Sequence, residues 1–166
     1  VIGKQAFDSC NSLKQIELSS NLTKICSGAF KSCTNLMEIS LPDSLEILEG
    51  EAFMNCRSLS AIEIPEGVTE IRGNTFEGCS SLTTLPPLNL SKVVYMEFAF
   101  GTCSALTALP TITVSVVNDC YGAFNNCNRV ASGALNMYNA FISQATPPSN
   151  YSGTFLNCGS DTVTGA

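Results

Sequence analysis

The sequence reads Ile-Cys-Ser-Gly-Ala-Phe-Lys-Ser-Cys-Thr-Asn-Leu-Met-Glu-Ile-Ser-Leu-Pro over residues 25–42, and this stretch decides the fold. Its apolar positions change period partway along. Ala29, Phe30 and Cys33 lie at i, i+1 and i+4, which is the spacing of one helical face. Ile39 and Leu41 lie at i and i+2, which is the spacing of one strand face. The stretch therefore predicts a helical turn, a corner, a short strand and a return turn.

The same pattern recurs along most of the chain. A phenylalanine returns every 23 or 24 residues, with a longer last interval of 31, and a cysteine follows each phenylalanine by three positions. A repeat this regular is typical of an array of stacked structural units. We expect the repeated aromatic and sulfur side chains to form the structural core: Phe7, Phe30, Phe53, Phe76, Phe100, Phe124 and Phe155, with Cys10, Cys33, Cys56, Cys79, Cys103, Cys127 and Cys158.

A unit of about 23 residues cannot bury its own apolar side, whereas a stack of units can. The predicted fold is therefore an α/β repeat, a right-handed solenoid. Its short parallel strands are expected to line the concave face, with short helical turns on the convex face.

The pattern I-G-x-x-A-F-x-x-C-x-x-L-x-x-I-x-L-P resembles the BspA-like leucine-rich repeat, also called the Treponema type, over nearly all of residues 1–130. The later units, F-E-G-C-S-S-L-T-T-L-P-P-L and F-G-T-C-S-A-L-T-A-L-P, look like a sister repeat of bacterial surface proteins and of some phage and prophage proteins. The resemblance implies a leucine-rich-repeat solenoid. It also implies an extracellular, often cell-surface protein that binds other macromolecules and has no catalysis.

The repeat decays toward the C-terminal end of the chain. We expect residues 1–130 to form about six repeats and residues 131–166 to form a degenerate, irregular terminal repeat. An inserted helix near 132–145 is predicted because Leu135, Tyr138, Phe141 and Ile142 have helical spacing, with Ser132 as its N-cap. This insertion accounts for the long last interval.

Nine cysteines are open to three interpretations. The one we favour is that they act as small buried hydrophobic side chains, because equivalent residues of adjacent coils are too far apart for a disulfide. Local bridges such as Cys26–Cys33 or Cys120–Cys127 are a second possibility. Metal binding is a third, although there is no Cys-x-x-Cys motif and no histidine.

The residues that alternate with the core positions of each predicted strand should point to the concave face. This face is the candidate binding site, with an acidic N-terminal end around Glu17, Glu38 and Glu63 and an almost neutral C-terminal end. The alternative is a surface that is merely solvated. The ten candidate residues are Gln15, Glu17, Glu38, Ser40, Ala61, Glu63, Thr84, Pro86, Ala108 and Pro110.

Composition excludes several classes of function. The chain has 166 residues with no histidine and a formal net charge of −6, which argues against a nucleic-acid groove and against histidine-based catalysis. No apolar run reaches the length of a membrane span. We therefore expect a protein that is not an enzyme and has no cofactor and no metal.

The leading hypothesis is an extracellular or cell-surface module that binds a host, matrix or other surface protein, adhesin-like, through the concave face. The acidic residues suggest a partner with basic character. The alternative is a virion or tail component of a phage or prophage that takes part in receptor binding. Because the chain starts at Val1-Ile2-Gly3 without a signal peptide, we expect a trimmed fragment whose targeting signal is missing. The pattern does not address the oligomeric state.

Overall fold

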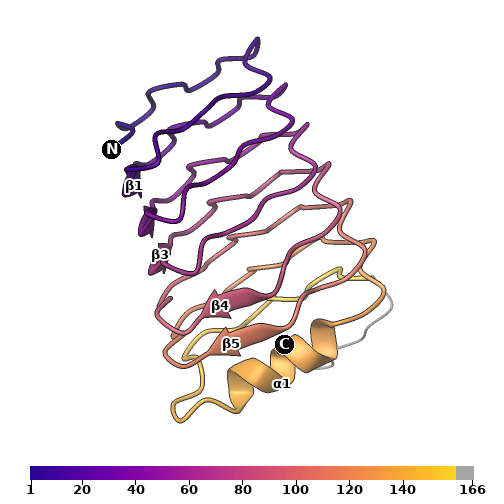
Figure 1. Cartoon of the computed structure of the whole chain (residues 1–166). Helices are drawn as coiled ribbons and strands as arrows, with labels where there is room; N and C mark the ends of the chain where they lie inside the picture. The colour runs from indigo at the N-terminus through magenta and orange to yellow at the C-terminus, as the bar shows by residue number, and fades with distance from the viewer. Residues whose placement is uncertain (160–166) are drawn as a thin grey trace.

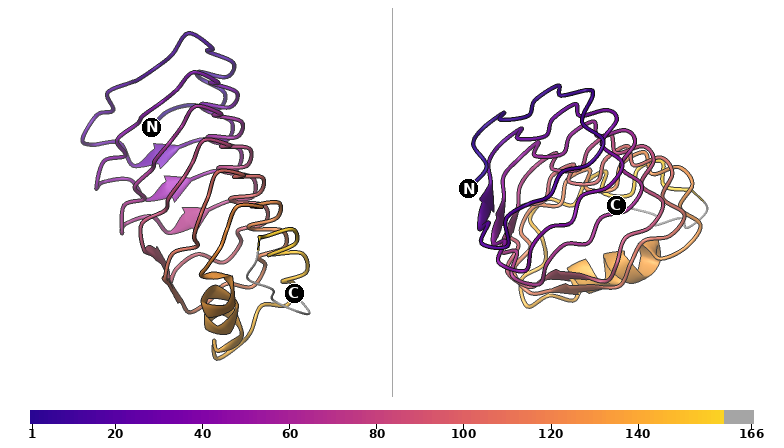
Figure 2. Two further views of the ribbon diagram at one scale, coloured as in Figure 1. Left: turned by 90° about the vertical axis from the view of Figure 1, so that its right-hand side faces the viewer. Right: turned by 45° about the horizontal axis from the view of Figure 1, so that its top comes forward.

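The computed structural model describes residues 1–159, and residues 160–166, the end of the expected terminal repeat, lie outside the described part. The described chain is a coil of stacked rungs, with its two ends at opposite ends of the stack (Figure 1). Successive rungs follow one another along the stack in both further views (Figure 2). Each rung contributes one member of the repeated phenylalanine set.

The strands are short and parallel, and they form two separate sheets. The first sheet has the order β1-β2-β3, from Lys24–Ile25, Ile47–Leu48 and Glu70–Ile71. The second pairs β4 (Leu88–Leu90) with β5 (Ile112–Val114), and a single helix of the described residues, α1, spans Ala134–Ile142. The strands and the helix thus agree with a leucine-rich-repeat type of fold.

The strands do not lie where the alternating pattern placed them. The segments around Ile16, Ile39 and Ile62 belong to no strand, and β1 to β3 follow them several residues later. Adjacent rungs are joined in these segments by a sparse ladder, such as Met37 N–H to Lys14 C=O at 3.0 Å and Ser60 N–H to Met37 C=O at 3.4 Å. The alternation of side chains is real, but it arises from extended chain with few cross-rung hydrogen bonds.

The expected helical turns are also absent. Each segment that carries a core phenylalanine is a run of turns, in which the residues two before and two after the phenylalanine have positive φ. Around Phe53, for example, these are Glu51 (φ 62°) and Asn55 (φ 60°). Left-handed backbone is costly for residues other than glycine. A compensating interaction must therefore hold these turns.

Hydrogen bonds between rungs supply that compensation. The N–H groups of Glu51, Phe53 and Asn55 donate to carbonyls of the next rung at 3.1, 2.8 and 2.7 Å, and the same three-bond ladder recurs from the first rung to the last. Because the residues two before and two after each phenylalanine have positive φ, the N–H groups of these two residues and of the phenylalanine all point along the stack toward the next rung. The phenylalanine segments thus form the most regularly bonded edge of the coil.

The phenylalanine rings form one continuous column inside this edge. Phe53 stacks on Phe30 with 5.3 Å between ring centroids and on Phe76 with 5.4 Å, with interplanar angles of 3° and 2°. The column continues to Phe155, 6.2 Å from Phe124. The five rings from Phe30 to Phe124 are fully buried. At the first rung, however, Phe7 is only half-buried and Cys10 is exposed, because within residues 1–159 the rings and thiols of this rung are covered from one side alone.

The repeated cysteines fill space in the core and also donate hydrogen bonds to the main chain. All nine are free thiols, so neither Cys26–Cys33 nor Cys120–Cys127 is a bridge. From the second rung on, the thiol donates to the main-chain carbonyl of the phenylalanine in the preceding rung, for example from Cys56 to Phe30 at 3.1 Å and from Cys79 to Phe53 at 3.2 Å. Burial raises the pKa of Cys33 to about 11 and that of Cys56 to about 12, which keeps the donated proton in place at neutral pH.

Helix α1 packs beside β5 at the C-terminal end of the coil (Figure 1). Its N-cap is Gly133 (φ 98°) and not the expected Ser132. A Cβ at Gly133 would lie 2.3 Å from the Leu109 carbonyl oxygen, so a side chain there would push the helix off the coil. The helix buries Ala134, Met137 and Phe141, whereas Leu135 and Ile142, which the spacing grouped with Phe141, are exposed.

A buried glutamine completes this end of the stack. The Gln144 side chain accepts from the Val117 N–H at 2.9 Å and donates to the Val117 carbonyl at 3.3 Å and to the Phe141 carbonyl at 3.0 Å. An amide side chain offers the same donor and acceptor as a peptide group. The Gln144 side chain therefore bonds the N–H and C=O groups of Val117, which elsewhere in the coil are bonded by the main chain of a neighbouring rung.

Candidate binding surface

The ten candidate residues lie eight and ten positions after successive core phenylalanines, and we call them the alternating face. Eight of them are exposed, and Pro86 and Pro110 are half-buried. The residue between each pair points the other way: Ile39, Ile62, Leu85 and Leu109 are buried, and Ile16 of the first rung is half-buried. The alternating face is thus a solvent-facing strip held from below by the hydrophobic core.

The acidic end of the alternating face has carboxylates without cationic neighbours in contact. Among residues 1–159, ion pairs join Lys24 to Glu49 at 2.6 Å and Lys31 to Glu51 at 2.5 Å. The face residues Glu17, Glu38 and Glu63 are in neither pair. Their charge is therefore available to a partner.

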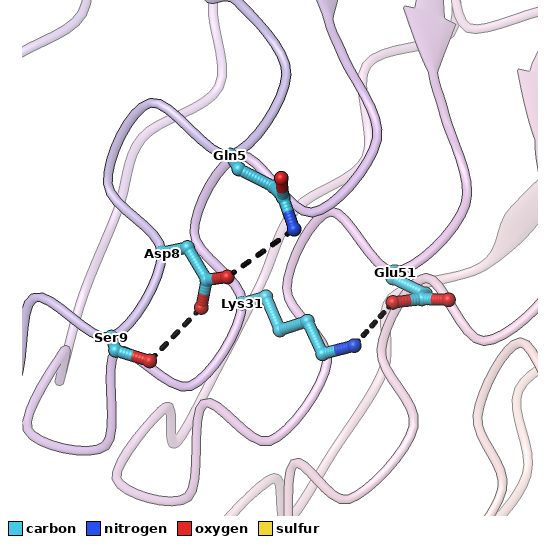
Figure 3. A network of polar contacts seen from close by, with 5 residues as sticks. All are labelled: Gln5, Asp8, Ser9, Lys31 and Glu51. Carbon is cyan, nitrogen blue, oxygen red and sulfur yellow. Dashed lines mark hydrogen bonds and ion pairs between the residues drawn. The ribbon is translucent and has the colours of Figure 1, made fainter.

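On the edge formed by the phenylalanine segments, by contrast, charged side chains form ion pairs and hydrogen bonds with other side chains of the protein. Figure 3 shows Lys31 reaching Glu51 of the next rung, and Asp8 accepting from Gln5 at 3.5 Å and from Ser9 at 3.0 Å. The hydrogen bond to Glu51 raises the pKa of Lys31. The contact between Lys31 and Glu51 links neighbouring rungs, whereas the two contacts of Asp8 stay within the first rung.

Two hollows in the surface were not predicted from the sequence. A smaller cavity of about 290 Å³ lies directly beside the alternating face, between Ile64–Glu66 and the β4–β5 sheet. A larger one of about 640 Å³ opens on another flank, between β3 and residues 92–97. The only hint of the larger cavity in the sequence is the lengthening of the repeat from 23 to 24 residues after Phe76.

Two negative findings concern the described part of the chain. Within residues 1–159 no group of three or more Cys, Asp or Glu side chains is arranged so that it could hold a metal ion. No described helix is long and apolar enough to cross a bilayer.

Stacked rungs, parallel short strands and a repeated inward-facing phenylalanine and cysteine define a protein of the leucine-rich-repeat class. The chain belongs to the BspA type leucine rich repeat family, whose model matches residues 1–131 in six copies. No curated protein sequence matches the chain significantly.

Three solved structures are similar to the chain. The leucine-rich repeat protein of Treponema pallidum aligns with a TM-score of 0.66 and 30% identity, over 78% of this chain and 59% of that protein. A leucine-rich repeat protein from Bacteroides ovatus aligns with a TM-score of 0.63 and 25% identity, over 77% of this chain and 33% of that protein. A leucine rich cell surface protein from Faecalibacterium prausnitzii has a TM-score of 0.41, with 28% identity over 61% of this chain and 32% of that protein. The chain therefore spans three fifths or less of the length of each of them.

Proposed function

We propose that the protein is a non-catalytic binding module that acts outside the cell or on its surface, and that it holds a protein partner through the alternating face. The partner carries a basic patch that meets Glu17, Glu38 and Glu63. The family to which the chain belongs supports binding as the activity.

The observation that carries this proposal is the combination of exposure and support along the face. Glu17, Glu38 and Glu63 are exposed, and the rungs that carry them are fixed by the buried Ile39 and Ile62 and by the phenylalanine column. A rigid surface loses little conformational entropy when a partner binds. Carboxylates at fixed spacing steer a basic partner and set its register.

The test is binding of the protein to a panel of purified extracellular matrix proteins that includes basic members, measured by surface plasmon resonance at several salt concentrations. We expect saturable binding to at least one basic member. The triple variant Glu17→Gln, Glu38→Gln and Glu63→Gln should weaken it by about tenfold and reduce its salt dependence, because three exposed ion pairs are lost.

The matched control removes the same amount of charge elsewhere. Asp43→Asn, Glu46→Gln and Glu66→Gln change exposed acids outside the alternating face. Asp43 and Glu66 lie on turns, and Glu46 directly precedes β2. This control should bind like the original protein. Equal losses in both triple variants, or no binding to any basic member, would remove the support for the proposal.

A further inference from the structure

One flank of the coil carries a ladder of parallel main-chain pairings that is interrupted once. Ile2 pairs with Ile25, β1 with β2 and β2 with β3, and farther along Tyr95 pairs with Asp119 and Asp119 with Asn150. Between β3 and Tyr95, no pairing joins the described residues. β3 is therefore an edge strand in the middle of the stack.

The main-chain groups on both sides of this interruption are turned toward it. The Arg72 N–H donates to the Leu48 carbonyl at 3.2 Å, so it faces β2. The Met96 N–H donates to the Asp119 carbonyl at 2.9 Å, so it faces the following rung. Because successive residues of an extended chain direct their N–H and C=O groups to opposite sides, the groups of Ile71 and Tyr95 face the interruption.

The interruption is a wedge and not a complete separation of the two rungs. Close to the phenylalanine edge the rungs remain joined, by the Asn74 N–H to the Glu97 carbonyl at 2.9 Å and by Phe76 stacked on Phe100 at 5.3 Å. Away from that edge they part around a cavity of about 640 Å³. A volume of this size lies within the range of natural ligand sites.

The walls of the wedge combine an apolar floor with charge at the mouth. Ile71 is buried, whereas Val94 and Tyr95 are 39% and 52% exposed although they line the cavity. Arg72 and Lys92 bring two of the eight cationic side chains of the protein to this wedge, and Glu97 is an acidic side chain that also lines it. An apolar wall beside a free strand edge suits an extended peptide, because the main chain supplies affinity and alternate side chains supply selectivity.

We propose that this wedge binds an extended peptide segment of a partner protein, which adds as a strand to the free edge of β3. The peptide places apolar side chains against Ile71, Val94 and the ring of Tyr95. Acidic side chains of the peptide lie toward Lys92. The wedge is distinct from the alternating face, so this proposal can be tested independently of the function proposed above.

The experiment uses a labelled synthetic peptide with the sequence of residues 44–50, Ser-Leu-Glu-Ile-Leu-Glu-Gly. In the protein this sequence contains β2, which already pairs in parallel with β3 on its other edge, and it carries two glutamates. Binding is followed by fluorescence anisotropy, and amide hydrogen exchange of the full chain is followed by NMR. We expect saturable binding and at least about tenfold slower exchange of the Ile71 amide. In the free protein this amide should exchange faster than the paired amides of β2 and β3, because no described main-chain group accepts its hydrogen.

Two controls separate strand addition from other attachment. A peptide with alternate main-chain nitrogens methylated keeps its side chains and should lose binding. Lys92→Glu should weaken binding about two- to fivefold, whereas Lys14→Glu, an equal charge change at an exposed residue outside the wedge, should not. The proposal is overturned by absence of saturable binding at millimolar peptide, by binding that leaves Ile71 exchange unchanged, or by equal binding of the methylated peptide.

Discussion

Replacing Phe53 by alanine should lower the free energy of unfolding by about 3–5 kcal/mol, the range found when a buried phenylalanine is removed. The Phe53 side chain is fully buried and stacks on a ring on each side. The substitution therefore leaves a cavity in the middle of the column and breaks two ring contacts at once. Urea denaturation followed by circular dichroism measures the change.

Two further alanine variants serve as controls for this prediction. Phe7→Ala makes the same chemical change at a half-buried ring that stacks only on Phe30 among the described aromatics, so it should cost clearly less. Glu63→Ala changes an exposed residue of the alternating face and should stay within about 0.5 kcal/mol. If all three variants were destabilised alike, the assignment of inward and outward positions would be wrong.

The second large effect is a loss of stability in alkaline solution. Burial raises the pKa of the Cys33 thiol to about 11 and of Cys56 to about 12, and it also raises the pKa of Cys79 and Cys103 well above the ordinary value. In the unfolded chain the thiols ionise near pH 8.5. Above that pH the unfolded state therefore releases protons that the folded state still holds.

The sign follows from this difference. Stability from the buried thiols is fully present below about pH 8.5 and is lost as the pH rises toward 11 to 12, because each such thiol makes unfolding more favourable by about 1.4 kcal/mol per pH unit. Urea titrations at a series of pH values should show a steep fall in this window.

Cys56→Ser isolates the contribution of one thiol. A serine hydroxyl can still donate to the Phe30 carbonyl but does not ionise in this window. The free energy of unfolding of the variant should therefore fall less steeply with pH, by about 1.4 kcal/mol less per pH unit, because one ionising thiol has been removed. Identical slopes for the variant and the original protein would show that the Cys56 thiol is not held protonated in the core.

The sequence was sufficient to predict the repeat, the family and a helix near the C-terminal end, because each rests on many similar residues. It did not correctly predict the local backbone conformation, namely where the strands lie and how the chain turns. Alternation around Ile39 arises in any extended segment, whether or not neighbouring rungs pair there, so it was interpreted as a strand. The actual strands, such as Lys24–Ile25, have only two residues and carry no periodic signal.

The turns around each phenylalanine were missed for a related reason. Residues such as Gln5, Glu51 and Phe98 have no intrinsic preference for positive φ, yet all three adopt it. The hydrogen bonds between rungs impose this conformation, and a single repeat does not reveal them. The wedge beside β3 was not predicted either, because it depends on the relative direction of peptide groups in two adjacent rungs.

Native-state alkylation of the nine cysteines tests the stacked core most directly. The protein is treated with iodoacetamide and the rate at each cysteine is followed by peptide mass spectrometry. The structure predicts rapid reaction at the exposed Cys10. It predicts reaction at the buried thiols Cys33, Cys56, Cys79, Cys103 and Cys127 only after unfolding, because a buried, protonated thiol is a poor nucleophile. Reaction of these five at the rate of Cys10 in the folded protein would contradict the inward-facing column on which the whole account depends.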